Sequence, residues 1–180
     1  MKNTKKIVII LILFLAIYSC STKKDTVISR NFHAITTKYN VLFNGKEAFK
    51  KGVEEINSNY KDDWFKRLPI EPIEFEEDKI VLSTFNNGPG AGFGGAKEEE
   101  KKELTTFEKA EEKAVKAIQR HGMNIQGSER NRQIDDAYLL LGKSRYYAQR
   151  FIPAIEAFNY VIANYPQADL IAETKVWRAK

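Results

Sequence analysis

The chain has 180 residues, of which 43% are hydrophobic and 29% are charged, and its formal net charge is +5. This length allows one or two small domains and excludes a large barrel enzyme. The composition excludes a disordered tail and a protein with several membrane spans. The single cysteine, Cys20, excludes a disulfide framework and a cysteine-rich zinc site, and the two histidines, His33 and His121, fit no His-rich metal motif.

Residues 1–19 have the features of a secretory signal peptide. Three lysines, Lys2, Lys5 and Lys6, precede an apolar run at residues 7–18. As a helix this run is about 18 Å long, which is shorter than the roughly 30 Å hydrocarbon core of a bilayer. A basic start followed by a short apolar core predicts a signal peptide. Removal of the three lysines lowers the net charge from +5 to +2, which argues against a nucleic-acid surface.

The predicted signal peptide ends in a motif that resembles the bacterial lipobox, Ile17-Tyr18-Ser19-Cys20. In lipoproteins the thiol of this cysteine receives a diacylglycerol, and the peptide is then cut before it. The resemblance implies a covalent lipid on Cys20, a tether at residues 20–28 and a mature chain outside the cytoplasm. Each buried CH₂ of such a lipid contributes about 0.8 kcal/mol to anchoring. The alternatives are an ordinary signal peptide with an incidental cysteine, or a signal anchor.

Residues 29–60 are predicted to form an N-terminal helical segment. Apolar residues recur in it near helical spacing, and Ser29 is the expected N-cap. The pair Asn44-Gly45 either separates two helices or lies inside one, and propensity does not decide between these alternatives. The apolar positions are Phe32, Ile35, Tyr39, Leu42, Phe43, Phe49, Val53 and Ile56.

Residues 61–102 are predicted to be a connector with a flexible Gly-rich loop. Pro69 and Pro72 favour an extended backbone, and residues 80–85 are the one short run with strand character. Residues 90–95 match the dinucleotide-binding pattern G-x-G-x-x-G. However, residues 98–100 are glutamates, which would repel a pyrophosphate at the start of the following helix. The only cofactor-like group expected is therefore the lipid on Cys20.

Residues 103–180 are predicted to form helical hairpins, which makes the chain an all-α protein. Serine at an N-cap and proline in a first turn mark the expected helix starts. The first expected helix begins in the charged segment 97–103 and ends at about Arg120, and residues 122–127 form a loop after it. The second extends from a Ser128 cap to about Gln149. The third extends from Pro153 to Tyr165-Pro166, and the fourth begins at about Ala168.

From Asp135 onward the chain carries the 34-residue tetratricopeptide pattern of an α-solenoid. Small residues at two of its positions allow the helices of a hairpin to approach closely, and a proline ends the second helix. Arg145 stands where an aromatic residue is usual. The residues expected to pack the repeat are Tyr138, Leu141, Gly142, Phe151, Ala154, Phe158 and Pro166.

An earlier copy of the same pattern supports the repeat. Phe107, Ala110, Ala114 and Ala117 have the spacing of the second helix, but they lie 44 residues before their counterparts. The ten residues beyond the usual period are assigned to the loop at 122–127 and to a longer helix after it. The alternative is a generic amphipathic hairpin. The pattern stops at Lys180 inside a truncated repeat, and an uncapped solenoid exposes its apolar end, so we expect the chain to be part of a longer protein or to be completed by a partner.

The first helix of a tetratricopeptide hairpin usually lines the inner surface of the solenoid. The corresponding residues are predicted to form a protein-binding face, and the alternative is that they pack against a neighbouring repeat or stay solvated. No catalytic or metal-binding constellation is found, so neither an enzyme nor a small-molecule substrate is expected. The residues of the predicted face are Asp136, Leu139, Lys143, Tyr146 and Tyr147.

Beyond the repeat, the chain resembles the amino-terminal part of the SprE/PorW lipoproteins of the Bacteroidetes. The most specific segment is NIQGSERNRQIDDAYLLLGKSRYYAQRFIPAIEAFNYVIANYP, supported by CSTKKD, SRNFHAITTKYNVLFNGKEA and LPIEP. The resemblance covers only the beginning of that family's longer proteins. It implies a periplasm-facing scaffold anchored to the outer membrane, which contacts protein components of the type IX secretion system and supports gliding motility. The family supplies no catalytic residues.

Two other lipoprotein classes also combine a lipid anchor with tetratricopeptide helices. One is a nutrient-binding lipoprotein of the starch-utilisation type, for which Trp64-Phe65 is the one candidate sugar platform. The other is an outer-membrane-protein assembly lipoprotein. These two classes stay open as alternatives to the secretion scaffold.

Overall fold

The computed structural model describes residues 21–73 and 105–180, and the fold is all-α. In these two ranges 67% of the residues are helical, and strand is limited to one two-stranded sheet. The predicted signal peptide, Cys20, the run at 80–85, the glycines at 90–95 and the charge run at 97–103 lie outside the described residues.

The N-terminal segment is one continuous helix at residues 27–59. It consists of α2 (Val27–Thr36), a π-helical turn η1 (Thr37–Leu42) and α3 (Phe43–Asn59), and the backbone is helical at both junctions. Asn44-Gly45 therefore lies inside a helix. The predicted Ser29 cap is wrong: Thr26 is the N-cap, and its side chain accepts a hydrogen bond from the Ser29 amide at 3.2 Å.

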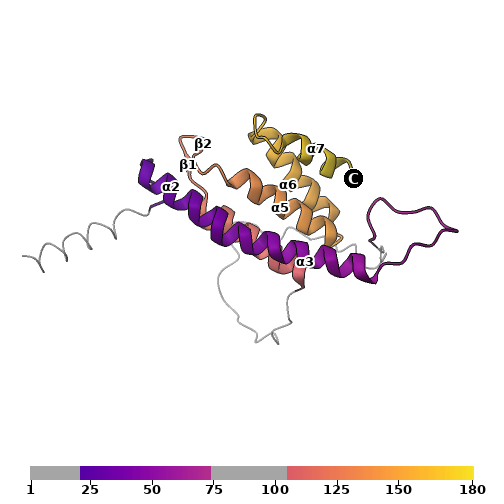
Figure 1. Cartoon of the computed structure of the whole chain (residues 1–180). Helices are drawn as coiled ribbons and strands as arrows, with labels where there is room; N and C mark the ends of the chain where they lie inside the picture. Colours follow the sequence, from indigo (N-terminus) through magenta and orange to yellow (C-terminus); the bar gives the residue numbers. More distant parts are fainter. Residues whose placement is uncertain (1–20, 74–104) are drawn as a thin grey trace, which may run out of the picture.

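The helices pack in chain order as a row of antiparallel neighbours (Figure 1). Helix α4 (Thr106–His121) lies between α3 and α5 (Ile134–Tyr147), α6 (Phe151–Asn164) packs on α5, and α7 (Ile171–Ala179) packs on α6. Glycines in α3 allow the closest approach: Gly52 faces Phe107 at the start of α4, and Gly45 faces Lys113 farther along it. Each helix from α3 to α7 thus buries one side against its neighbour in sequence.

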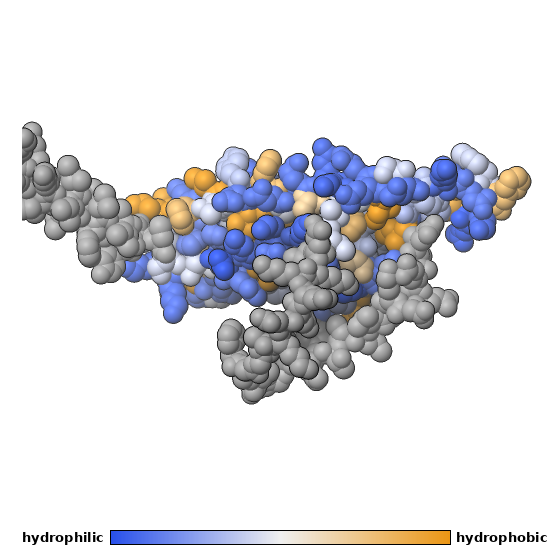
Figure 2. Space-filling view, turned by 90° about the horizontal axis from the view of Figure 1, so that it is seen from below, coloured by the Kyte–Doolittle hydropathy of each residue, from blue (hydrophilic) through white to orange (hydrophobic). Residues whose placement is uncertain are grey.

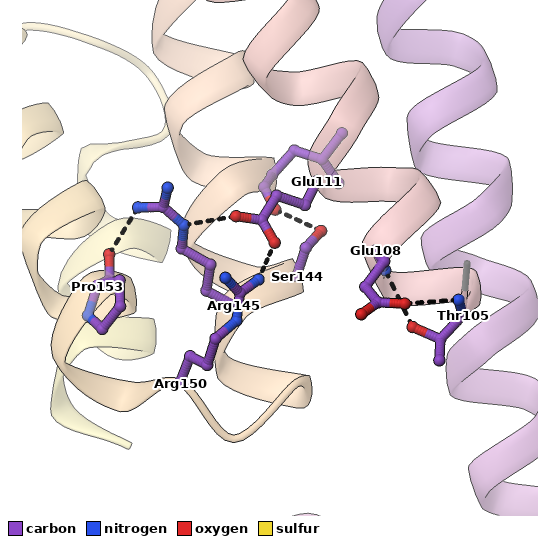
Figure 3. Close-up of polar contacts among 8 residues, drawn as sticks. Thr105, Glu108, Glu111, Ser144, Arg145, Arg150 and Pro153 are labelled. Carbon is purple, nitrogen blue, oxygen red and sulfur yellow. Dashed lines mark hydrogen bonds and ion pairs between the residues drawn. The ribbon is translucent and has the colours of Figure 1, made fainter. Parts of the chain in front are cut away.

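Helix α4 begins with a capping box. The Thr105 side chain accepts from the Glu108 amide at 3.3 Å, and the Glu108 carboxylate accepts from the Thr105 amide at 2.8 Å (Figure 3). These two bonds satisfy backbone donors that a helix start otherwise leaves unpaired. The capping box therefore explains why α4 begins at Thr106.

Helices α4 and α6 bury residues at the same spacing, as the two copies of the repeat pattern predict. In each helix these positions lie three, seven and ten residues after a phenylalanine; all three are alanine in α4, whereas α6 has alanine, phenylalanine and valine. Phe151 is half-buried and the others are buried. The two sets are Phe107, Ala110, Ala114 and Ala117 in α4, and Phe151, Ala154, Phe158 and Val161 in α6.

The connection between α4 and α5 is a β-hairpin, which the sequence analysis described only as a loop. Strand β1 (Asn124–Ile125) pairs antiparallel with β2 (Ser128–Glu129). Gln126 and Gly127 between them have φ of 53° and 76°, which is typical of a two-residue type I′ turn.

The predicted Ser128 cap is wrong, because Ser128 lies in β2 and α5 begins at Ile134. Since α5 has only 14 residues, the ten residues beyond the usual repeat period lie in the hairpin connection and not in a longer helix.

The last two helices follow the prediction closely. Pro153 lies in the first turn of α6, and α6 ends at Asn164, directly before Tyr165-Pro166. The expected fourth helix is present as α7, but it begins at Ile171 and not at Ala168, because residues 166–170 form turns.

Candidate functional site

The residues of the predicted protein-binding face lie where α5 meets its neighbours. Leu139, Tyr146 and Tyr147 are buried. Asp136 and Lys143 lie at the edges of this surface in ion pairs, Asp136 with Lys46 of α3 at 2.9 Å and Lys143 with Glu173 of α7. Leu139, Tyr146 and Tyr147 therefore follow the alternative, in which the residues pack against neighbouring helices. We call this surface of α5 the inner face.

An aromatic cluster fills the inner face. The Tyr147 ring stacks on Phe107 with a centroid distance of 5.0 Å and meets the edge of Phe49 at 5.3 Å. The Tyr146 ring makes edge contacts with Phe151 at 5.6 Å and with Trp177 of α7 at 5.8 Å. Edge and offset contacts of this kind stabilise a packed site beyond their buried area, so the face is preformed.

The connector after α3 returns to the inner face. The Tyr147 hydroxyl donates a hydrogen bond to a Glu71 carboxylate oxygen at 2.9 Å, and Lys180 forms an ion pair with the other oxygen. Ile73 is buried in the same cluster. The non-helical connector is therefore attached by one carboxylate and one apolar side chain. Pro69 and Pro72 indicate its irregular backbone, but no local signal predicts where it docks.

Electrostatics support this attachment. Burial and the hydrogen bond to Glu71 raise the pKa of Tyr147, so its phenol stays protonated and remains a donor. The Lys180 ammonium also lies over the Trp177 ring, 4.1 Å from the centroid, and Lys143 lies over the same ring at 5.0 Å. Cations over an indole face are attracted by the ring.

A cavity of about 450 Å³ lies beside the docked connector. Ile56, Ile73, Phe107 and Tyr147 give it apolar walls, and Glu55 contributes to its lining. The rest of its lining is largely polar and includes Asn59, Thr105, Thr106 and Gln149, so the cavity combines apolar walls with several hydrogen-bonding groups.

A second cavity, of about 540 Å³, lies between the β-hairpin connection and the turn after α6. Asp135, Asp169 and Glu129 line it together with Arg132. Burial raises the pKa of Asp135, and the neighbouring Asp136 and Asp169 charges act in the same direction. No group of three or more metal-ligating side chains occurs within residues 21–73 and 105–180.

The residues predicted to pack the repeat lie between α5, α6 and the turn that follows. A Cβ atom on Gly142 would lie 2.3 Å from the Phe158 ring, Tyr138 stacks on Tyr160 at 4.1 Å, and Pro166 lies in the turn after α6. Leu141 and Ala154 are buried, and Phe151 is half-buried.

Arg145, which departs from the repeat pattern, has a specific partner. Its Nε donates to Glu111 of α4 at 2.9 Å, and its Nη1 donates to the Pro153 carbonyl at 3.2 Å. Arg150 at the start of α6 pairs with the other oxygen of Glu111 (Figure 3). One carboxylate thus joins α4, α5 and α6, and sequence reasoning missed it because the three residues belong to different helices.

The structure also brings together the two histidines, which are far apart in the sequence. Their Nδ1 atoms are 3.0 Å apart, and His33 is buried. Burial lowers the pKa of both rings, and for His121 the charges of His33, Lys116 and Arg120 act in the same direction. The pair therefore favours a state in which one hydrogen lies between the two Nδ1 atoms over a state in which both rings are protonated and charged.

The comparisons with known proteins give no relative: no protein-family model matches the chain, and no curated protein matches it. In the part of the chain that the structure describes, no helix combines the length and apolar character that a bilayer span requires.

Proposed function

We propose that the chain is a tetratricopeptide lipoprotein that serves as a scaffold of the type IX secretion system and supports gliding motility. It is anchored to the outer membrane through Cys20, faces the periplasm and binds protein components of the apparatus. The observation that supports a protein-binding role is the inner face, where Tyr147 and the aromatic cluster receive Glu71 and Ile73 of a non-helical segment. The secretion and gliding role rests on the sequence resemblance alone.

The tetratricopeptide part of the proposal is supported by packing. Gly142 and Phe158 occupy the small and large positions at which two helices of such a hairpin meet, and they are in contact. Helices α4 and α6 bury residues at the same spacing. We therefore propose that α3 and α4 form one repeat, that α5 and α6 form the next, and that α7 begins a third.

The lipid anchor is tested by replacing its attachment atom. We expect Cys20→Ser to abolish lipid labelling and to leave the protein out of the outer-membrane fraction, because the thioether requires sulfur. Ser21→Ala is the matched control and leaves labelling unchanged. A Cys20→Ser protein that is still found in the outer membrane would refute the anchor.

The secretion role is tested by deleting the gene. We expect loss of secreted cargo proteins from the medium and loss of gliding on agar, with both restored by the wild-type gene. Normal secretion together with lost growth on a glycan would instead support the nutrient-binding alternative. In that case Trp64 and Phe65, which are 78% and 101% exposed, become the first residues to replace.

A further inference from the structure

Helix α2 presents its polar side to the protein and its apolar side outward, and this outward side continues past η1 to Phe43, although Val41 and Leu42 of η1 are buried. Ser29, His33 and Thr37 are buried at intervals of four residues. The apolar residues left outside, which we call the outer stripe, are Ile28 (68% exposed), Phe32 (44%), Ile35 (58%), Tyr39 (67%) and Phe43 (56%).

Hydrogen bonds keep the polar side inward. The Ser29 hydroxyl donates to the Ser21 carbonyl at 2.7 Å, and the Thr37 hydroxyl donates to the His33 carbonyl at 2.6 Å. The Asn131 amide then donates to the Thr37 hydroxyl at 3.1 Å. The bond from Asn131 joins the helix to the segment before α5, so rotation of the helix to bury its apolar side would break this bond and leave buried polar groups unpaired, which is costly. The outward stripe is thus a stable feature of the fold.

The outer stripe is continuous. Its members at 28, 32, 35 and 39 are spaced by four, three and four residues, which places them on one side of a helix. Figure 2 shows apolar side chains gathered at the end of the molecule formed by α2. Contiguous apolar patches on a protein surface mark sites of interaction with a membrane or another protein.

We propose that the outer stripe lies against the lipid surface to which Cys20 attaches the chain. This inference rests on the proposed lipid anchor. Ser21, the residue after Cys20, is hydrogen-bonded to Ser29 in the first turns of α2. Only six residues separate Cys20 from Val27, and even fully extended they reach about 25 Å. An acylated Cys20 therefore holds α2, more than any other helix, close to the bilayer surface.

The chemistry of the stripe suits the membrane interface. Aromatic and aliphatic side chains insert at the boundary between headgroups and acyl chains, and lysines beside them attract anionic lipids. Lys23 and Lys24 precede the helix, and Lys38 lies beside Tyr39 with its ammonium 5.4 Å from the ring. Asp25, which follows these lysines, is paired with Arg30 and Arg130, and no other acidic residue occurs before Glu47.

The test places one fluorescent label in the stripe of the lipidated full chain. In that protein the Cys20 sulfur is blocked by its thioether, so Phe32→Cys carries the one free thiol. The labelled protein is reconstituted into vesicles of phosphatidylethanolamine and phosphatidylglycerol that contain nitroxide-labelled lipid. We expect the nitroxide to remove most of the emission at position 32. Ile152→Cys on α6 is the matched control and keeps its emission, although Ile152 is more exposed (58%) than Phe32 (44%).

Three results would overturn the inference. Equal, weak quenching at positions 32 and 152, with both labels open to aqueous iodide, would place the stripe in water. Shielding of position 32 from both iodide and nitroxide lipid would mean that protein covers it, either a second copy or another partner. Absence of lipid on Cys20, measured by mass spectrometry, would remove the anchor together with the inference. Ile35→Cys repeats the measurement, and circular dichroism confirms that each variant is folded.

Discussion

Gly142 of α5 and Phe158 of α6 are in contact across the helical hairpin, so close that a Cβ atom on Gly142 would lie 2.3 Å from the Phe158 ring. Phe158 is 1% exposed and is packed in the same cluster as Leu139 and Tyr147 of the inner face. The separation of α5 and α6 therefore depends on the missing side chain at position 142.

We expect Gly142→Ala to lower the free energy of unfolding by about 1–3 kcal/mol, because the added methyl group overpacks a buried ring. This loss outweighs the gain of about 1 kcal/mol that alanine has over glycine as a helix former. Urea denaturation followed by circular dichroism measures it. Gly127→Asn is the control, since position 127 has open space and asparagine tolerates its φ of 76°. Equal stability of Gly142→Ala and wild type would contradict the close contact.

We expect Glu111→Gln to destabilise the protein by about 1–3 kcal/mol, because it leaves two partly buried arginines without their carboxylate. The side chain of Glu111 is 15% exposed and pairs with Arg145 and Arg150. Glu54→Gln on α3 is the matched control, since its side chain is 65% exposed and 3.8 Å from Lys50. Thermal denaturation of both variants tests this prediction, and equal melting temperatures would show that the shared carboxylate does not join the helices.

The His33–His121 pair predicts a stability that falls in acid. Both pKa values in the folded chain lie below the ordinary 6.5, so the unfolded chain binds more protons as the pH falls below 6.5. Stability is therefore full above that pH and is lost progressively below it. We expect His121→Gln to reduce this loss between pH 7.5 and 5 in urea titrations. Lys38→Gln is the control, and an unchanged pH dependence in His121→Gln would refute the role of the pair.

Loss of the Tyr147 hydroxyl is expected to loosen the docked connector without unfolding the helices. Tyr147→Phe keeps the ring contacts with Phe107 but removes the donor to Glu71, a bond worth about 0.5–1.5 kcal/mol. Limited digestion with trypsin measures it, because Lys66 and Arg67 precede the docked residues. We expect faster cleavage there in Tyr147→Phe, whereas Tyr39→Phe, at an exposed hydroxyl, leaves the rate unchanged. Equal rates in both variants would mean that Ile73 and the Lys180–Glu71 ion pair hold the segment without the tyrosine hydroxyl.

Local signals in the sequence predicted much of the helical framework. Pro153 in a first turn and Tyr165-Pro166 after a last turn define α6 within a residue or two, because proline restricts the backbone at its own position. The spacing of Phe107, Ala110 and Ala114 predicted the buried side of α4, since helical periodicity places such residues on one face. These signals act within a few residues of the feature they determine.

Residue type alone did not predict the structure where a polar side chain had two possible roles. Ser29 and Ser128 are both suitable caps by type, but Thr26 takes the cap of α2, and a type I′ turn at Gln126-Gly127 places Ser128 in a strand. The π-helical turn η1 was also missed, because such turns are rare and no local propensity indicates them.

The sequence by itself determined an all-α chain, the positions of its small and large packing residues, and the cysteine that is the predicted attachment point. The tertiary structure alone decided which sides of α2 and α5 are free. The face predicted to bind a partner is filled by Phe107, Trp177 and the connector with Glu71, whereas the apolar side of α2 is left outside. Periodicity shows that a helix has an apolar side, but hydrogen bonds such as that between Asn131 and Thr37, 94 residues apart, decide where that side points.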